Sequence, residues 1–490
     1  MVARAPSVIV IGAGFAGLAM AVALRKIGVH DFVVLEAGDR LGGTWRDNTY
    51  PGCACDVPSH LYSFSFAPNP NWSRDYSSQP EILDYLESTA NRLDLRSHVV
   101  FGARVSAANW DEARALWRLE TADGRTFEAP FVVAGTGPFS RPRFPAVAGL
   151  DRFRGSTFHS ARWDHSFDPR GKRIAAIGTG ASAIQFIPEL AKDAARLLVV
   201  QRSAPWVLPK ADAPFREATK RAFARFPAAE RLLRARIYWQ LESRALGFVV
   251  DPRILSIGEW MGRRHIAAHI RDPKLARAVT PTFRMGCKRV LFSNDYYPTL
   301  TRPNVTLLPH GLIEVREDSI VTDDGRAHAV DAIVFGTGFD MTGGSLVGGP
   351  VVGRDGADLD TLWRGGAEAY LGVAVAGFPN WFLLLGPNSG LGHNSMIFMI
   401  EAQARYVAAH VARARREGLR TVEVRSAAQR QFNEGLRARL PRTVWSSGCT
   451  SWYLDERGRN VTLWPGFTVE YWLRTRRIRL ADFVSDGGAS

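Results

Sequence analysis

Two glycine-rich loops carry the residue spacing in this chain that points most directly to chemistry. Each loop directly follows a short apolar run, at residues 8–11 and 174–177, and opens a stretch with helical periodicity. The pattern G-x-G-x-x-G/A lets the backbone approach a pyrophosphate, whose charge meets free N–H groups at a helix N-terminus. A strand-to-helix turn that simply needs glycine is the alternative explanation. The candidate cofactor-binding residues are Gly12, Gly14 and Gly17 in the first loop and Gly178, Gly180 and Ser182 in the second, where Ala183 fills the last motif position.

The residue that closes the next apolar run differs in charge between the two loops. Glu36 and Arg202 stand at the same offset from the first glycine of their own loop. An acid at this position accepts hydrogen bonds from a ribose 2′-OH, whereas an arginine accommodates a 2′-phosphate. The first site is therefore predicted to bind an unphosphorylated dinucleotide and the second NADPH, unless Arg202 is only a solvated surface residue. Two dinucleotides in one chain indicate electron transfer between them, and FAD is the natural occupant of the first site.

Length and charge set broad limits on the function. The chain has 490 residues, enough for two or three domains, and a formal net charge of +14. The cations are scattered, apart from short clusters at 413–416 and 474–479. We interpret them as a solvated arginine-rich surface, with no nucleic-acid partner. A basic nucleic-acid- or membrane-binding protein that merely holds a nucleotide is the disfavoured alternative. No transmembrane segment is predicted, because prolines and asparagines break the longest uncharged stretch, 370–392.

The cysteines and histidines suggest neither a disulfide framework nor a metal site. Four cysteines are too few for such a framework, and Cys53 and Cys55 are too close together for the usual redox C-x-x-C motif. We therefore expect a reduced, cytoplasmic compartment, without a signal peptide before the first strand. His265 and His269 have the i, i+4 spacing of metal ligands, but no third ligand at a suitable spacing accompanies them, so no metal is predicted.

The order of the apolar patterns predicts an α/β protein with two Rossmann-like dinucleotide-binding domains, the second inserted in the first. Residues 1–145 form the first part of the FAD-binding domain. Residues 146–330 form the NADPH-binding domain, with a helical insertion at about 210–281. Residues 331–338 repeat the strand and G-T-G of 132–137, so the chain is expected to return to the first domain there. Residues 331–490 then complete that domain and add a C-terminal segment.

Two longer motifs resemble a known family. Residues 153–164 fit F-x-G-x-x-x-H-x-x-x-W-[P/D], the fingerprint of type I Baeyer–Villiger monooxygenases, which are class B flavoprotein monooxygenases. A second pattern of that family, [A/G]-G-x-W-x4-[F/Y]-P-[G/M]-x3-D, fits residues 42–56. The resemblance covers essentially the whole chain and is closest to the 4-hydroxyacetophenone monooxygenase branch, on residues 57–60, 286–289 and 386–390. The fingerprint residues are Phe153, Gly155, His159 and Trp163.

The resemblance implies a reaction and two catalytic residues. NADPH reduces FAD, the reduced flavin and O2 give a C4a-peroxyflavin, and this attacks a ketone to yield an ester or lactone. Arg289 matches the family's catalytic arginine, and Asp56 the carboxylate that orients it and borders the flavin site. A permanently charged guanidinium suits the oxyanions formed on this path. A merely structural ion pair is the alternative.

The resemblance also assigns further cofactor contacts. Gly43, Thr44, Trp45 and Trp452 match family residues near the flavin and NADP, and Lys288 joins Arg202 at the 2′-phosphate. His159 is implied to link the domains and not to perform acid–base chemistry. Core packing is the alternative for His159 and both tryptophans.

One departure from the family and two alternative functions remain. Val290 stands where the cyclohexanone and phenylacetone branches usually have proline, which leaves the substrate class open. A flavin-containing monooxygenase that oxidises sulfur or nitrogen is the second hypothesis, and a flavoprotein reductase serving a protein partner is the third. The partners we expect are a small ketone and O2, and the oligomeric state is left open.

Overall fold

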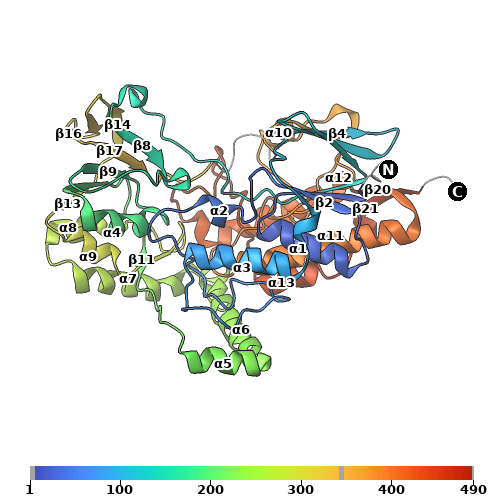
Figure 1. The fold of residues 1–490 in the computed structure, drawn as a ribbon, viewed down its shortest axis with the longest axis horizontal. Helices are drawn as coiled ribbons and strands as arrows, with labels where there is room; N and C mark the ends of the chain where they lie inside the picture. Colours follow the sequence, from blue (N-terminus) through green and yellow to red (C-terminus); the bar gives the residue numbers. More distant parts are fainter. Residues whose placement is uncertain (1–5, 341–346, 488–490) are drawn as a thin grey trace.

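The computed structural model describes residues 6–340 and 347–487 and contains two parallel five-stranded sheets, seen apart in Figure 1. All four residues of the first sheet's central strand are buried, as expected for a parallel sheet covered on both faces. The first sheet has the order β19 (Trp381–Leu383), β7 (Phe131–Ala134), β1 (Val8–Ile11), β2 (Phe32–Leu35) and β3 (Val99–Val100).

The second sheet repeats this plan around its own central strand. It has the order β8 (Ser156–His159), β17 (Ala332–Phe335), β9 (Arg173–Ile177), β10 (Arg196–Val200) and β13 (Val305–Leu308). β9 corresponds to β1, and β10 and β2 are the strands whose ends carry Arg202 and Glu36. The predicted class, α/β with two Rossmann-like units, is confirmed.

The expected return of the chain to the first domain at Asp331 is wrong. β17 lies inside the second sheet, paired with β8 and β9. A Cβ placed on Gly178 would lie 2.7 Å from the carbonyl oxygen of Gly336, and one on Gly12 would lie 2.6 Å from that of Gly135. The repeated G-T-G therefore marks the same position in each sheet, beside that sheet's own glycine loop. After β17 the chain rejoins the first unit by β18 (Val351–Val352), which pairs with β4 (Val105–Asp111).

Small sheets complete both units. A hairpin turn at Asp123 and Gly124 joins β5 (Leu116–Thr121) to β6 (Thr126–Ala129), and these strands form a four-stranded sheet with β4 and β18. β14 (Leu312–Val315), β15 (Ser319–Thr322) and β16 (Ala327–Ala329) form a three-stranded sheet. β20 (Leu419–Val424) pairs with β21 (Phe483–Gly487) near the C-terminus.

Helices follow each glycine loop and cover the sheets. α1 (Phe15–Lys26) packs against α11 (Met396–Glu417), which is ended by Gly418 in the left-handed region. α4 (Ala183–Asp193) follows the second loop. The others in these units are α2 (Thr44–Asp47), α3 (Gln79–Arg92), α9 (Tyr296–Leu300), α10 (Leu359–Trp363), α12 (Ser426–Arg439) and α13 (Thr468–Arg474).

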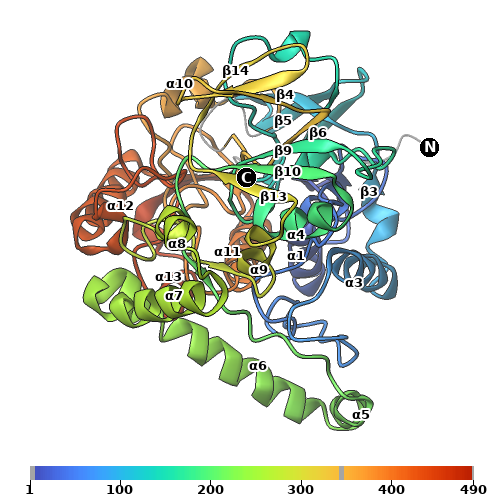
Figure 2. The same ribbon diagram turned by 90° about the vertical axis from the view of Figure 1, so that its left-hand side faces the viewer.

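The segment predicted as a helical insertion is helical. It is bracketed by a short parallel pair, β11 (Val207–Leu208) and β12 (Leu291–Phe292). In Figures 1 and 2, α5 and α6 project away from both sheets. Its elements are α5 (Glu217–Arg225), α6 (Pro227–Glu242), the π-helix η4 (Leu246–Val250), the 3-10 helix η5 (Pro252–Leu255), α7 (Ser256–His269) and α8 (Pro273–Val279).

The cysteine prediction needs a correction. Cys287 and Cys449 form a disulfide with their Cα atoms 6.1 Å apart, while Cys53 and Cys55 are free and buried. The sequence separation of 162 residues hides this pair from any local spacing rule. The cysteines therefore no longer support the expectation of a reduced compartment, because two of them form a disulfide. No helix in residues 6–340 and 347–487 is long and apolar enough to cross a membrane.

Candidate active site

The first glycine loop contains glycines that packing of the protein requires and one glycine, Gly14, that it does not require. A Cβ on Gly17 would lie 1.8 Å from the carbonyl oxygen of Gly12, so helix α1 can only pack here with glycine. A Cβ on Gly14 would find its nearest protein atom, the Cα of Gly43, at 3.7 Å. The protein itself does not require glycine at position 14. Space left open beside a helix N-terminus fits the close approach of a pyrophosphate.

Glu36 lies at the end of β2 and is buried, with 4% of its surface exposed. Its Oε2 accepts a hydrogen bond from the N–H of Ala13 at 2.8 Å. Its Oε1 accepts from the N–H of Gly38 at 2.7 Å and from Nη1 of Arg46 at 2.6 Å. The carboxylate thus fixes the glycine loop, and Oε2 retains a lone pair that a ribose hydroxyl can use.

In the second glycine loop, too, one glycine is required by packing and another is not. Gly178 has a φ of +100° and leaves no room for a side chain, whereas a Cβ on Gly180 would lie 4.0 Å from its nearest neighbour, the oxygen of Gly336. Ser182 directly precedes α4. Gly180, like Gly14, is therefore free of any packing demand from the protein, and a second dinucleotide phosphate fits the space beside it.

Two cations lie together at the end of β10. Arg202 is exposed and forms no ion pair within the described residues. Nζ of Lys288 donates to Oγ of Ser203 at 3.0 Å. Burial and, second, the charge of Arg202 lower the pKa of Lys288. Two positive charges held close together without a carboxylate form a site for an anion. A 2′-phosphate supplies the negative charge that such a site binds.

The two tryptophans predicted for the site differ in exposure. Gly43 precedes α2, and this helix carries Thr44 and the buried Trp45, whose indole N–H donates to Oη of Tyr62 at 3.1 Å. Trp452 is 37% exposed, and its ring centroid lies 4.4 Å from that of the buried Tyr453. Trp45 is therefore fixed by packing and a hydrogen bond, while Trp452 keeps a surface that a ligand can cover.

Arg289 and Asp56 form the ion pair that the sequence predicts. Nε and Nη2 of Arg289 donate to the same oxygen, Oδ2 of Asp56, at 2.9 and 2.6 Å. The charge of Asp56 raises the pKa of Arg289 against the opposing effect of burial. A third of the Arg289 side chain remains exposed, and its Nη1 donates no hydrogen bond within the described part of the chain. The pair therefore orients the guanidinium and leaves one of its nitrogens available.

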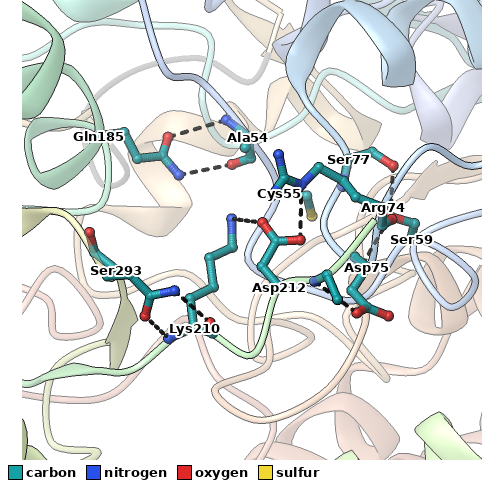
Figure 3. A network of polar contacts seen from close by, with 12 residues as sticks. Ala54, Cys55, Ser59, Arg74, Asp75, Ser77, Gln185, Lys210, Asp212 and Ser293 are labelled. Atoms are coloured by element: carbon teal, nitrogen blue, oxygen red, sulfur yellow. Dashed lines mark hydrogen bonds and ion pairs between the residues drawn. The ribbon is translucent and has the colours of Figure 1, made fainter. Parts of the chain in front are cut away.

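The loop that carries Asp56 is tied to the second unit through helix α4. Nε2 of Gln185 donates to the carbonyl of Ala54 at 3.0 Å, and Oε1 accepts from the Ala54 N–H at 3.4 Å (Figure 3). Oη of Tyr50 donates to the same Oε1 at 3.0 Å. The Cys55 N–H donates to the carbonyl of Ser77 at 3.0 Å. These contacts fix the backbone that leads into Asp56.

A second anchor joins the start of the helical insertion to the first unit. Asp212 accepts from Nε of Arg74 at 3.0 Å and lies 3.8 Å from Nζ of Lys210 (Figure 3). The N–H of Ala213 donates to Oδ2 of Asp75 at 3.1 Å. Two independent sets of contacts thus hold the units on which Asp56 and Arg289 lie.

The fingerprint residues are mainly structural. A Cβ on Gly155 would lie 2.3 Å from the carbonyl oxygen of Asp331, so only glycine lets β8 pack beside β17. Phe153 packs partly buried beneath the second sheet. The ring of Trp163 lies 5.0 Å from Phe158 and 5.6 Å from Phe186 of α4. The motif therefore secures the edge strand of the second sheet against its neighbours.

His159 ends β8 and is 1% exposed. Its Nδ1 accepts from the N–H of Ala161 at 3.1 Å, and its ring packs against Phe144 and Phe339. Burial lowers the pKa of His159 to about 4, so the ring is neutral near pH 7. The neutral ring therefore caps the turn that follows β8 as a hydrogen-bond acceptor.

Several residues that shape the site could not be identified from the sequence. Gln185, Tyr62 and Ser203 each contact a predicted site residue or its loop through hydrogen bonds between distant segments. Cys287 and Cys449 join two site-forming segments. None of these stands in a motif of its own, so only the fold brings them together.

Comparisons with known proteins agree with this geometry. Residues 9–216 match the family model described as pyridine nucleotide-disulphide oxidoreductase. The chain is 47% identical over 477 residues to a Baeyer-Villiger monooxygenase of Pseudomonas aeruginosa, covering 97% of this chain and 90% of that protein. It resembles the structure of an oxidized steroid monooxygenase bound to NADP, with a TM-score of 0.88, 34% identity and coverage of 99% and 100%. The structure of the OTEMO complex with FAD and NADP matches with a TM-score of 0.89, 28% identity and coverage of 98% and 99%.

The matches to the relative and the two solved structures extend over nearly the whole length of the compared proteins. They therefore include both glycine loops and both dinucleotide sites. The chain belongs to the Baeyer–Villiger monooxygenases, flavoproteins that use FAD and NADPH.

Proposed function

We propose that Arg289 is the catalytic cation of this monooxygenase. Its unused Nη1 is the observation that supports this role most directly, because the other two guanidinium nitrogens are committed to Asp56. During oxygen insertion, negative charge develops on the carbonyl oxygen of the ketone. A guanidinium keeps its charge at any working pH and offers fixed donors to that oxygen.

Asp56 is proposed as the positioning partner of Arg289. A carboxylate that accepts two N–H bonds on one oxygen restrains the guanidinium plane, so that little reorganisation remains at the moment of reaction. The Gln185 and Ser77 contacts hold the two residues that precede Asp56. Relative movement of the two units would therefore move the catalytic cation against its anchor.

The cofactor sites are assigned from the open space and unpaired charge described above. Gly12, Gly14, Gly17 and Glu36 would hold FAD, with Gly43, Thr44 and Trp45 beside it. Gly178, Gly180 and Ser182 would hold the NADPH pyrophosphate, Arg202 and Lys288 its 2′-phosphate, and Trp452 would cover part of the nucleotide. When bound and reduced, the flavin supplies the activated oxygen that the ketone receives.

The proposed overall reaction consumes one ketone, O2, NADPH and a proton. It gives an ester or lactone, NADP⁺ and water, so that one oxygen atom enters the carbon skeleton and the other leaves as water. The 4-hydroxyacetophenone-type branch suggested by residues 286–289 stays a proposal, and with it an aryl ketone as the first substrate to try.

The first experiment is a product analysis. The purified FAD-loaded protein is incubated with NADPH, O2 and aryl, linear and cyclic ketones, with a sulfide in parallel, and product masses are measured. An ester or lactone one oxygen heavier than its ketone is the expected result. Sulfoxide as the sole product, or hydrogen peroxide with every ketone, would contradict the proposal.

An Arg289→Ala variant tests the assigned cation. It should keep bound FAD and NADPH-driven flavin reduction, because hydride transfer creates no oxyanion at this position. Ester formation should fall about 100- to 1000-fold, the usual cost of losing one oxyanion donor. Arg289→Lys keeps the charge without the donor fork and serves as the matched variant. Ester formation by Arg289→Ala at the wild-type rate would remove Arg289 from the mechanism.

We also propose a cytoplasmic location and no nucleic-acid partner. The reaction draws on NADPH, which supports the cytoplasm, whereas the Cys287–Cys449 disulfide is of a kind that is rare in that compartment. Cell fractionation with activity assays of each fraction tests the location. Activity confined to a secreted or periplasmic fraction would overturn it.

A further inference from the structure

The helical insertion gathers most of the chain's exposed apolar surface. More than half of the exposed large apolar side chains in the described residues lie between 226 and 261. We call the exposed residues of segment 226–264 the insertion surface. Single exposed apolar side chains need no explanation, but a concentration of them in one projecting segment indicates an interaction surface. The most exposed are Leu232 (73%), Ile257 (64%), Phe226 (58%), Trp239 (58%), Val250 (57%) and Trp260 (57%).

Helix α6 shows that this exposure follows a pattern. Leu232, Ala235 and Trp239 are spaced i, i+3, i+7 and all face solvent. Glu230 and Leu241 lie on the opposite side and are each 5% exposed. A helix on a globular protein normally turns its apolar stripe toward the core. On α6 an apolar stripe points outward, so the helix has a second face without a partner in this chain.

The charges around this stripe are of one sign. Every exposed charged residue of the insertion surface is an arginine. The acidic residues of the segment are either buried or half-buried, and the half-buried Asp251 and Glu259 pair with Arg253 and Arg263. Arg231 and Arg236 flank the α6 stripe and form no ion pair within residues 6–340 and 347–487. The guanidinium of Arg264 lies 5.5 Å from the ring centroid of Trp260.

We propose that the insertion surface docks on an anionic lipid bilayer. Leucine and tryptophan side chains between unpaired arginines fit a membrane interface, where apolar groups enter the acyl boundary and arginines meet anionic headgroups. Helix α6, which carries the apolar stripe, projects from the body of the molecule in Figures 1 and 2, so a flat surface can reach it. The protein lies on the bilayer and does not span it.

The charges disfavour a second copy of this chain as the occupant. A two-fold contact would place the same surface on both sides and bring the arginines of one copy against the equally basic surface of the other. The cations behind the net charge of +14 were interpreted from the sequence as a solvated surface. If the insertion surface docks on anionic lipid, the headgroups neutralise part of that charge. The sequence did not show this because exposure of Leu232 and Trp239 depends on which side of α6 packs inward.

Sedimentation with vesicles tests the proposal on the FAD-loaded full-length protein. The vesicles contain phosphatidylcholine alone or phosphatidylcholine with phosphatidylglycerol. Wild type should sediment with the anionic vesicles only, and raising NaCl from about 0.05 M to about 0.5 M should release it through charge screening. The double variant Leu232→Ser/Trp239→Ser should need at least about tenfold more lipid for half-binding.

The matched control carries the same kind of change elsewhere. Ile313 and Leu362 are 50% and 51% exposed and lie on β14 and α10, at the opposite end of the molecule from α6 in Figure 1. Ile313→Ser/Leu362→Ser should bind vesicles like wild type. Arg231→Glu/Arg236→Glu should lose anionic binding while retaining NADPH oxidation, because neither residue contacts the site.

Three results would overturn the proposal. In the first, wild type stays in the supernatant with anionic vesicles. In the second, the α6 variants bind vesicles as well as wild type. In the third, ultracentrifugation finds a concentration-dependent dimer that the α6 variants abolish. The last would assign the surface to a second copy of this chain.

Discussion

Cys287 is joined to Cys449 by a disulfide, although 162 residues separate them in the chain. Cys287 is buried in a cluster with Val444 and Trp445 and lies two residues before Arg289. Cys449 lies three residues before Trp452. The bond therefore ties the loop of the proposed catalytic cation, Arg289, to the C-terminal segment that is proposed to cover the nucleotide.

Removing this bond should loosen the site and lower stability. Closing so long a loop restricts the unfolded chain, and such bonds typically contribute about 2–4 kcal/mol. Cys287→Ala/Cys449→Ala should melt several degrees lower and release more hydrogen peroxide per NADPH, as measured by thermal unfolding and product assays. A dithiol reductant should affect wild type and leave the double variant unchanged. Thiol titration of the denatured, unreduced protein should find Cys53 and Cys55 only, and four reactive thiols would show that the bond is absent.

Arg202 should determine the choice between NADPH and NADH. Its charge acts on Lys288, and a charge-assisted hydrogen bond to a 2′-phosphate is worth about 1.5–3 kcal/mol. Arg202→Ala should raise the KM for NADPH about tenfold or more and leave the KM for NADH unchanged. Arg196, exposed at the other end of β10, provides the control, since Arg196→Ala should change neither value. Equal increases for both nucleotides with Arg202→Ala would mean that Arg202 does not contact the 2′-phosphate.

The elements that position the site were predictable where local pattern decides them. The strands before Gly12 and Gly178, the helices after them and the charges at Glu36 and Arg202 all follow from short-range spacing. The Arg289–Asp56 contact joins residues far apart in the chain and was predicted only through the family resemblance.

The errors share one physical cause. The repeated G-T-G at 135–137 and 336–338 was correctly noticed, but its sheet could not be assigned, because the same strand pattern serves both units. The Cys287–Cys449 pair and the outward stripe of α6 likewise depend on which segments pack together. Local periodicity determines that an element forms, while tertiary packing determines which neighbour it meets.

Substitutions in the second glycine loop should show which of its glycines serves folding and which serves cofactor binding. Gly180→Ala adds a Cβ whose nearest neighbour is 4.0 Å away, so the protein should fold with an unchanged melting temperature and full FAD content. The same methyl group enters the space assigned to the NADPH pyrophosphate, and the KM should rise about tenfold or more. Gly178→Ala is the contrasting variant, because a φ of +100° and a contact of 2.7 Å should prevent normal folding. A wild-type KM in Gly180→Ala would show that no phosphate lies against this residue.

His410 should make the fold sensitive to acid. The ring is fully buried in α11, 4.4 Å from Phe483 and 4.8 Å from Tyr406 between ring centroids. Burial, reinforced by the charge of Arg413, lowers the pKa of His410 from its ordinary 6.5 to about 3. The unfolded chain therefore gains a proton as the pH falls below about 6.5, whereas the folded chain stays neutral down to about pH 3.

The resulting loss of stability is absent above about pH 6.5 and grows as the pH falls toward 3, reaching about 2 kcal/mol near pH 5. His410→Phe removes this proton uptake and keeps the aromatic packing, so its melting temperature should fall less than that of wild type between about pH 7 and pH 5. His30→Phe changes an exposed ring and should follow the wild-type curve. Parallel melting curves for wild type and His410→Phe across this range would show that His410 does not contribute to the acid sensitivity.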